Sequence, residues 1–293
     1  LLIISIDLLK KTFYTTFIVL NIKKKENIKF RNEIKPYKRF RFKLLLKRRK
    51  KMSPYATKVL AFDLDGTLTQ HKSPLSPEYR ELLCRLGEKY TLLMVGAGSC
   101  VRIFKQMRRF PIEIIGNYGM QYAVVKEEAS HPRIVLERDN RAEVDKALAV
   151  RRADELRREL GYTSYMGDTI EIHESGMLTF PILGTAAPIQ DKLSYDPDRS
   201  KRRAVYDRVV DKFPEYKVYV GGSSSFDIVP HPYAKLYALD LFCRERGLSH
   251  EEIWYFGDDY GIGGNDEDVF LSDVPFQCID DYRTIPEYLK QFL

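Results

Sequence analysis

Two aspartates follow an apolar run near residue 60. Asp63 and Asp65 come directly after the β-prone segment Val59–Phe62, and Gly66 follows them. A continuous apolar run predicts a buried parallel strand, and open α/β sheets bind ligands at the carboxyl ends of such strands. On an ideal strand, residues i and i+2 point to the same face. We therefore expect both carboxylates in one cleft, where a cation or a shared proton would relieve their repulsion.

A loop of small residues follows the second predicted strand. Residues 90–95 are mostly apolar, Gly96 to Ser99 are small, and a helix is expected over 101–109. Backbone N–H groups between a strand and a helix lie at a positive helix end, which suits a phosphate. We therefore take Gly98 as a substrate-binding residue and Ser99 as a catalytic residue that holds phosphate oxygens. For Ser99 alone, an ordinary helix N-cap is the alternative.

A lysine and a third acidic position complete the set. Lys235 begins a predicted helix, and Asp258 ends a predicted strand. Phosphoryl transfer needs a nucleophile, an acid or base for the leaving oxygen, a divalent cation and positive groups around the phosphoryl oxygens. A carboxylate can be that nucleophile, and Mg²⁺ prefers few carboxylates plus waters and phosphate oxygens. The sequence predicts a Mg²⁺ site formed by Asp63, Asp65 and Asp258, with Lys235 as a catalytic residue that offsets their charge.

Apolar strands alternate with helices around these positions. Over residues 52–136 and 231–293, this alternation predicts an α/β fold with a Rossmann-like parallel-sheet core and its site at the strand ends. Residues 137–230 differ, because long amphipathic helices over 140–160 and 200–213 accompany several short strands. Two helices against three or four antiparallel strands form an α+β unit. We expect this unit to be a cap domain inserted into the core.

Charge is distributed unevenly along the 293 residues. The formal net charge is +7, yet residues 1–51 hold 17 Lys/Arg and only 3 Asp/Glu, and the remaining residues hold 31 Lys/Arg and 38 Asp/Glu. A nucleic-acid function would therefore depend on the N-terminal segment alone. We expect residues 1–51 to be disordered or to reflect a mis-assigned start, with the protein beginning at Met52. A signal peptide or anchor, a transit peptide and a basic arm are the alternatives.

The cysteines give no sign of a metal site or of disulfides. Cys84, Cys100, Cys243 and Cys278 are widely spaced and form no C-x-x-C pair. A reducing, cytoplasmic compartment is therefore expected. We expect a small phosphorylated substrate as the partner, with neither nucleic acid nor a membrane, and a homodimer through the cap is one option for the oligomeric state.

Several motifs resemble one known superfamily. The stretch Phe62-Asp63-Leu64-Asp65-Gly66-Thr67-Leu68-Thr69 resembles the first motif of the haloacid dehalogenase (HAD) superfamily of aspartate-nucleophile phosphotransferases, of the Cof-type (IIB) subgroup. Other stretches are similar to its eukaryotic-type phosphomannomutase branch, namely Phe256-Gly257-Asp258-Asp259 with Gly263-Gly264-Asn265-Asp266, and residues 221–230 followed by Lys235. The resemblance spans residues 58–293. It implies Asp63 as nucleophile, Asp65 as general acid/base, Mg²⁺ as cofactor, and Ser225 and Asp227 as sugar-hydroxyl contacts.

The chain departs from that branch where a second phosphate would be held. The branch has arginines in Arg-Asn-Gly-Met-Leu and Pro-Ile-Gly-Arg, whereas this chain has Glu174-Ser175-Gly176-Met177-Leu178 and Pro181-Ile182-Leu183-Gly184-Thr185. An arginine binds phosphate bidentately, whereas Glu174 would repel it. Lys192, Arg199, Arg202 or Arg203 could compensate, although no motif places them. The Glu-Asn-Gly turn of the branch is also altered, to Asn117-Tyr118-Gly119.

Loss of the second phosphate anchor would leave the aspartyl-phosphate chemistry intact and make water the acceptor. We therefore predict a Mg²⁺-dependent phosphohydrolase that acts on a small phosphorylated metabolite, with a sugar phosphate as the favoured class. Phosphomannomutase is the alternative. A non-catalytic sugar-phosphate-binding protein is a third hypothesis, which the intact set of Asp63, Asp65, Ser99, Lys235 and Asp258 argues against.

Overall fold

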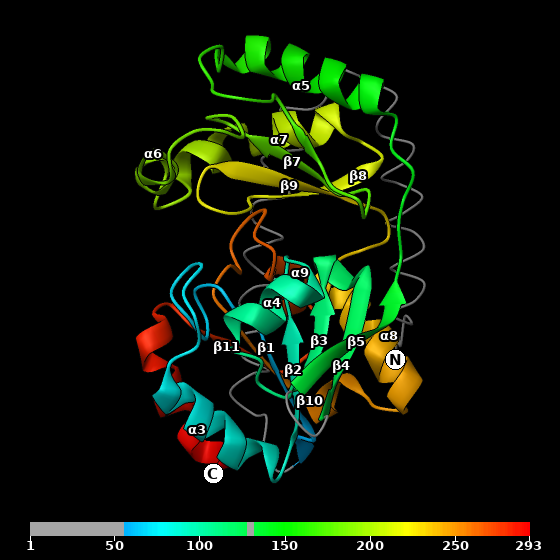
Figure 1. Ribbon diagram of the computed structural model, residues 1–293, viewed down its shortest axis with the longest axis vertical. Helices are drawn as coiled ribbons and strands as arrows, with labels where there is room; N and C mark the ends of the chain where they lie inside the picture. The colour runs from blue at the N-terminus through cyan, green and yellow to red at the C-terminus, as the bar shows by residue number, and fades with distance from the viewer. Residues whose placement is uncertain (1–55, 128–131) are drawn as a thin grey trace, which may run out of the picture. The chain divides into compact units, whose positions relative to one another are not determined.

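The computed structural model describes residues 56–127 and 132–293, and the expectations for residues 1–51 lie outside them. The described residues form two β-sheets, a seven-stranded one and a four-stranded one. Figure 1 shows the larger sheet in the lower half and the smaller sheet in the upper half, joined by the chain after β5 and after β9. The fold is α/β with a Rossmann-like core, as the sequence predicted. The predicted domain boundaries stay a prediction.

The larger sheet contains the predicted parallel strands. Its order is β11 (Phe276–Cys278), β10 (Ile253–Gly257), β1 (Val59–Phe62), β2 (Thr91–Val95), β3 (Glu113–Gly116), β4 (Gln121–Glu127) and β5 (Pro132–Asp139). The first five strands pair in parallel, and β4 and β5 continue the sheet as an antiparallel hairpin. All four residues of β1 are buried. Its uninterrupted apolar sequence follows from this, because helices cover both faces of a parallel sheet.

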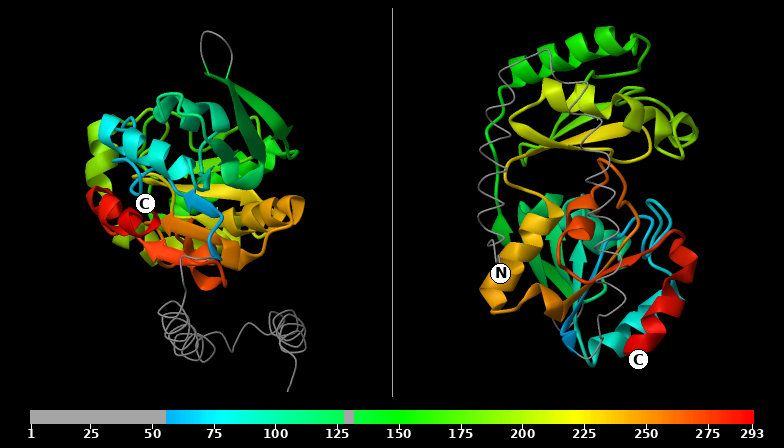
Figure 2. Two further views of the ribbon diagram at one scale, coloured as in Figure 1. Left: turned by 90° about the horizontal axis from the view of Figure 1, so that it is seen from below. Right: turned by 180° about the vertical axis from the view of Figure 1, so that it is seen from behind.

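Helices cover the two faces of this sheet (Figure 1 and Figure 2). The helices α3 (Pro77–Gly87), α4 (Cys100–Gln106) and α10 (Ile285–Leu289) pack on one face, and α8 (Lys235–Arg246) and α9 (Glu267–Leu271) pack on the other. Two residues typical of helix starts begin α3, since Ser76 Oγ accepts a hydrogen bond from Tyr79 N at 3.2 Å and Pro77 occupies the first turn. Leu83 and Leu86, at helical spacing, are its buried anchors.

The smaller sheet is antiparallel and carries helices on one face. Its order is β6 (Glu171–Ile172), β7 (Leu178–Pro181), β9 (Ser225–Pro230) and β8 (Tyr216–Tyr219), and its helices are α5 (Lys146–Leu160), α6 (Ile189–Tyr195) and α7 (Ser200–Lys212). Side chains alternate along a strand. Phe226 and Ile228 of β9 therefore pack under α5 and α7, while Ser225 and Asp227 lie on the opposite, polar face.

Some element limits differ from the sequence-based expectation. The helix expected from residue 140 begins at Lys146, because β5 continues to Asp139 and Asp145 caps the helix by accepting from Leu148 N at 2.9 Å. Along this helix Ala147 is exposed, and Ala149 is buried. The sequence analysis does not predict α6, a helix of seven residues none of which is buried.

The cysteines agree with the expected absence of disulfides. Cys84, Cys100 and Cys243 are free thiols, so no pair forms among the four cysteines of the chain. Burial raises the pKa of Cys100 to about 12 and that of Cys243 to about 11, so neither is a thiolate at neutral pH. In residues 56–127 and 132–293, no helix combines the length and the apolar content needed to cross a bilayer.

A histidine connects α8 to the segment before β11. His250 lies in the short helix η3 (His250–Glu252), with Nε2 at 2.7 Å from Asp240 Oδ1 and Nδ1 in hydrogen-bond contact with Asp273. The hydrogen bond with Asp240 is the largest cause that raises the pKa of His250 to about 9, and Asp273 adds to it against the effect of burial. The charged imidazole therefore bridges two carboxylates.

We predict that this bridge weakens at alkaline pH. The folded pKa of His250 lies above its unfolded value of about 6.5, so its contribution to stability is complete below about pH 6.5 and is lost as the pH rises through about 9. Solvent screening at this partly exposed position limits the contribution to about 1 kcal/mol. Urea unfolding of the wild type and of His250→Asn across pH 6–10 measures it. The difference between the two proteins should shrink with rising pH, and a constant difference would contradict the bridge.

Candidate active site

Asp63 lies at the carboxyl end of β1 and is buried. Its N–H donates to Phe256 O at 2.9 Å, and its Oδ1 accepts from Lys235 Nζ at 2.6 Å. No described residue donates a hydrogen bond to Oδ2, which keeps its lone pairs for a reaction. Burial raises the pKa of Asp63 well above its ordinary value, Lys235 opposes that rise, and Asp266 and Asp258 add to it.

Lys235 begins α8 and is fully buried. Its Nζ donates to Asp63 Oδ1 at 2.6 Å, Asn265 Oδ1 at 2.8 Å and Asp266 Oδ1 at 2.8 Å, which uses all three ammonium donors. Burial lowers the pKa of Lys235, but Asp266 and Asp63 raise it above its ordinary value overall. Asp266 is itself fixed, since Tyr255 Oη donates to the same oxygen at 2.7 Å. The lysine therefore holds Asp63 in one orientation.

Asp258 brings a third carboxylate to this point. β1 and β10 pair in parallel with Phe62 opposite Phe256, so the residues after both strands meet. Asp63, Asp258 and Asp266 offer oxygens that all lie within 4.8 Å of one another. Burial raises the pKa of Asp258 to about 6, and Asp266 adds to this. A group of crowded, buried carboxylates fits a hard divalent cation such as Mg²⁺, which would offset their repulsion.

The structure does not bring the carboxylate of Asp65 into this acidic group, although the sequence predicts it as a metal ligand. The strand ends at Phe62, and the chain turns at Gly66, where φ is +95°. The alternation that would align Asp65 with Asp63 therefore does not continue to residue 65. Asp266, which no spacing argument singled out, takes the third position in the group.

Asp65 lines the same cavity with a different set of partners. Its carboxylate accepts from Gln106 Nε2 at 2.7 Å, from Lys72 N at 2.7 Å and from the Arg102 guanidinium at 3.2 Å. Burial alone would raise the pKa of Asp65, but Arg102, Gln106 and Lys72 N together lower it below its ordinary value. Asp65 is therefore ionised at neutral pH, which suits a proton acceptor.

Gly98 and Ser99 line the cavity after β2, as predicted. Ser99 is the N-cap of α4, and its Oγ accepts from Arg102 N at 3.3 Å. A Cβ at Gly98 would lie 2.1 Å from Arg102 Nε, so a side chain there would displace the guanidinium. Both residues thus help to place Arg102 beside Asp65, and their contact with phosphate stays a prediction.

Ser225 and Asp227 reach the cavity from β9. Asp227 accepts a hydrogen bond from Tyr118 Oη at 2.7 Å, and the Tyr118 ring stacks on Tyr219 with centroids 4.7 Å apart. Tyr118 lies in the short helix η2 (Asn117–Gly119), fully buried and at φ +56°. A left-handed conformation costs a residue other than glycine about 1–2 kcal/mol. This strained tyrosine connects the seven-stranded sheet to the four-stranded sheet, which is called the cap sheet from here on. The sequence indicates an altered turn at this position but does not predict the contact with Asp227.

The basic residues that could replace the missing cap arginines all have partners within the chain. Lys192 donates to Thr185 O at 2.8 Å, and the fully buried Arg202 binds Asp196 Oδ2 at 2.8 Å and Gly221 O at 2.6 Å. Arg203 binds Asp259 at 3.0 Å, and Arg199 binds Asp258 at 3.2 Å and Asp259 at 3.0 Å. Two of these arginines therefore reach across to the acidic loop after β10.

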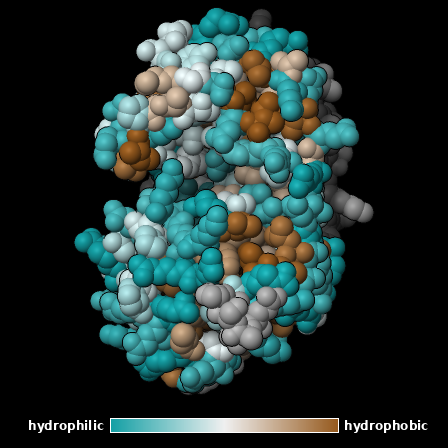
Figure 3. Space-filling model, viewed as in Figure 1, coloured by the Kyte–Doolittle hydropathy of each residue, from teal (hydrophilic) through white to brown (hydrophobic). Residues whose placement is uncertain are grey.

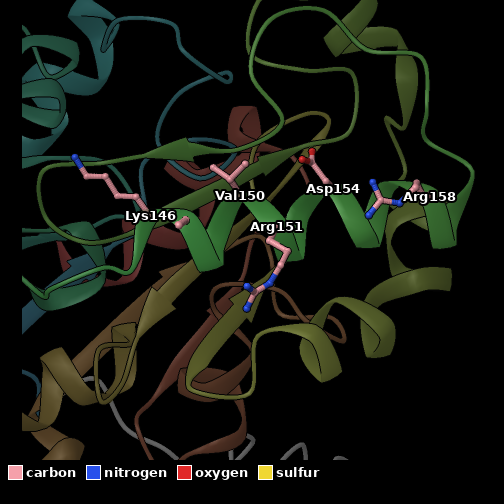
Figure 4. A pocket seen from close by; sticks show the side chains of 6 residues that line it. Lys146, Val150, Arg151, Asp154 and Arg158 are labelled. Carbon is pink, nitrogen blue, oxygen red and sulfur yellow. The ribbon is translucent and has the colours of Figure 1, made fainter.

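One cavity of about 1220 Å³ lies between the two sheets, and its lining includes Asp63, Asp65, Ser99, Arg199, Asp227 and Asp258. Figure 3 shows the hollow between the upper and lower halves, bordered largely by hydrophilic residues. A second hollow of about 580 Å³ lies on the outer surface of α5 and is lined by Lys146, Ala147, Val150, Arg151, Asp154 and Arg158. Figure 4 shows that these side chains leave one helix in different directions, so they do not converge on a ligand.

Comparison with known proteins finds phosphomannomutases among the relatives. A family model described as eukaryotic phosphomannomutase matches residues 155–283, a range that contains Lys235 and Asp258 but begins after Asp63. A phosphomannomutase of Triticum aestivum is 28% identical over 227 residues, covering 72% of this chain and 85% of the relative. A phosphomannomutase of Drosophila melanogaster is 26% identical over 248 residues, covering 79% of this chain and 95% of the relative.

Solved structures share the fold at low sequence identity. An IMP-bound IMP-nucleotidase mutant of Plasmodium falciparum superposes with a TM-score of 0.59 at 14% identity, covering 80% of this chain and 68% of that one. A phosphatase of the HAD superfamily from Bacteroides thetaiotaomicron gives a TM-score of 0.51 at 16% identity, with 80% and 95% covered. At this identity the likeness concerns the fold alone.

We predict that Lys235→Met destabilises the protein by about 3–5 kcal/mol, because it leaves Asp63 and Asp266 buried without their cation. Urea unfolding at pH 7 measures the loss. Lys105→Met, on the exposed side of α4, is the control and should change stability by no more than about 0.5 kcal/mol. Adding Asp266→Asn to Lys235→Met should recover part of the loss. A Lys235→Met protein as stable as the control would contradict the buried ion pair.

Proposed function

Because the chain is a haloacid dehalogenase superfamily protein near the phosphomannomutase branch, we propose that it is a Mg²⁺-dependent phosphohydrolase. It acts through an aspartyl-phosphate on a small phosphorylated metabolite, a sugar phosphate. The charge of the cap side of the cavity carries this proposal. Within residues 139–230, the lining has three arginines against five carboxylates: Arg141, Arg199 and Arg202 against Asp139, Glu171, Glu174, Asp196 and Asp227.

This lining disfavours a second phosphate on the substrate. A phosphate dianion would meet a net negative surface there, and like charges at close range repel. The arginines are also already paired, since Arg202 is buried against Asp196 and Arg141 lies 3.2 Å from Asp139. A substrate with one phosphate, bound at Asp63, avoids this repulsion. Hydroxyl groups of a sugar fit the polar face that Ser225 and Asp227 present.

In the first step, Asp63 Oδ2 attacks phosphorus and the bond from phosphorus to the metabolite oxygen breaks. The leaving oxygen takes a proton, for which the resemblance implies Asp65 as the donor. Because Asp65 is ionised at neutral pH, it first takes this proton from bulk water and returns one to bulk water after the second step. Lys235 stays bound to Oδ1 and keeps the attacking oxygen oriented. Asp63 and Asp258 would hold the Mg²⁺, which supplies positive charge against the repulsion between carboxylate and phosphate.

In the second step, water attacks phosphorus and the bond to Asp63 Oδ2 breaks, which frees phosphate and restores the carboxylate. The water gives its proton to Asp65. The partners of Asp65 favour this role, because Arg102 and Gln106 keep its carboxylate ionised and fixed in the cavity. The two steps together consume one water and return every group to its starting state.

Phosphomannomutase is the second candidate, and the names of the relatives favour it. A mutase must hold a second phosphate on the cap while the first is transferred. Arg141 would be its anchor, since its side chain is 60% exposed and it lies 4.0 Å from Glu174.

Other expectations from the sequence stay predictions. They are a cytoplasmic location, a homodimer through the cap and the absence of nucleic-acid and membrane partners.

We predict that Asp63→Asn removes phosphate release from sugar phosphates, because an amide cannot form the acyl phosphate. Purified protein with Mg²⁺ and a panel of phosphorylated metabolites, followed by phosphate release, measures the loss. Asp211→Asn, the same change at an exposed position of α7 outside the cavity lining, serves as the matched control. Turnover retained in Asp63→Asn would refute Asp63 as the nucleophile.

A product analysis separates the two candidates. With mannose 1-phosphate, a hexose bisphosphate and Mg²⁺, we expect free phosphate to form faster than mannose 6-phosphate, because the cap lacks a free second anchor. Glu174→Arg should then shift the ratio towards mannose 6-phosphate, since it reverses the charge at that position. Efficient isomerisation with little free phosphate in the unmodified protein would overturn the hydrolase proposal in favour of the mutase.

A further inference from the structure

One cap arginine contacts the acidic group of the core directly. Arg199 Nη2 lies 3.2 Å from Asp258 Oδ2, and Nη1 lies 3.0 Å from Asp259 Oδ1. Arg203, one turn along the same helix, contacts Asp259 and Ile262 O. Among the described cap residues, Arg199 is the one that forms an ion pair with Asp258. Asp258 in turn belongs to the acidic group that could hold a metal.

A fixed turn presents Arg199 to the core. The residue precedes α7 in a left-handed conformation, with φ +62°, and its N–H donates to Asp196 O at 3.1 Å. Asp196 is buried and accepts from Lys201 N at 3.0 Å and from Arg202 N at 3.0 Å. A strained residue persists where its surroundings fix it, and such residues gather at functional sites. The turn thus holds the guanidinium at the acidic group.

The carboxylates of the acidic group form ion pairs with different side chains. Lys235 binds Asp63 and Asp266, whereas Asp258 receives Thr67 Oγ1 at 3.3 Å on one oxygen and Arg199 at 3.2 Å on the other. Burial alone would lower the pKa of Arg199, but Asp259 and Asp258 raise it overall, so the guanidinium is charged. An ion that binds Asp258 must therefore compete with Arg199.

We propose that Arg199 is the resident counter-ion of Asp258, and that a divalent cation bound at Asp63 and Asp258 displaces it into the cavity, where it binds phosphoryl oxygens. A guanidinium released from Asp258 stays in the cavity that Asp63 also lines, and arginine pairs with phosphate bidentately. The proposal needs the metal site, but it holds for a hydrolase and for a mutase alike. Its tests therefore use binding and not turnover.

Metal affinity gives the first test. Mn²⁺ binding without substrate, followed by electron paramagnetic resonance, should be about tenfold tighter in Arg199→Gln than in the wild type, because a competing positive charge is removed. Arg208→Gln, on the same helix and paired with Glu159 at the surface, is the matched control and should bind Mn²⁺ as the wild type does. Equal or weaker Mn²⁺ binding by a folded Arg199→Gln would overturn the proposal.

The chemical reactivity of Arg199 in the wild-type protein gives the second test. This test needs no substitution, so it does not depend on whether a variant folds. Phenylglyoxal modification, read by peptide mass spectrometry, should be slow at Arg199 in the metal-free protein, faster with Mg²⁺, and slow again with Mg²⁺ plus inorganic phosphate. Arg208 provides the internal control, with a constant rate. An Arg199 rate that Mg²⁺ leaves unchanged or lowers would overturn the displacement, and an absence of protection by phosphate would overturn the phosphoryl contact.

Discussion

Lys235 is fully buried between Asp63 and Asp266, and its ammonium contacts both carboxylates. Removing a lysine charge from water costs several kcal/mol, and only close, well-oriented partners offset this cost. The three residues come from the start of α8, the end of β1 and the loop after β10, so the ion pair fixes three distant segments at one point. The orientation of the nucleophile, the approach of Asp258 and the position of the acidic loop all depend on this contact.

The cap meets this centre through contacts that differ in kind. The buried Tyr118 donates a hydrogen bond through Oη to the half-buried Asp227, which gives a directional contact between the two sheets. Arg199 forms ion pairs with Asp258 and Asp259 at the far side of the cavity, where the strength depends on the charge around them. The first contact is insensitive to a metal, and the second is not. These two contacts join the cap sheet to the core together with others, including the hydrogen bond from Val220 N to Gly263 O at 2.8 Å and the ion pair of Lys217 with Asp268.

The parts of this site that local sequence rules describe could be predicted. Apolar runs ending in polar residues predicted that Asp63 and Asp258 lie at one edge of the sheet, because parallel strands are buried on both faces and end there, and Lys235 was predicted at a helix start. The carboxylate of Asp65 does not join the group of Asp63, Asp258 and Asp266, because the strand ends at Phe62 and the chain turns at Gly66; its role as a metal ligand stays a prediction. The pairing of Tyr118 with Asp227 spans 109 residues of sequence and leaves no periodic signal. Such contacts follow from the packing of the cap, which no single segment encodes.

The charge balance of the site links its two ligands. Four carboxylates, Asp63, Asp258, Asp259 and Asp266, face the three cations Lys235, Arg199 and Arg203, which leaves one negative charge in excess. A phosphate dianion alone would increase that excess to three, and Mg²⁺ alone would reverse it to one positive charge. Bound together, they leave the balance unchanged. Since uncompensated charge in a buried site is costly, the site favours joint occupancy by metal and phosphate, and a mobile arginine lets it accept them in turn.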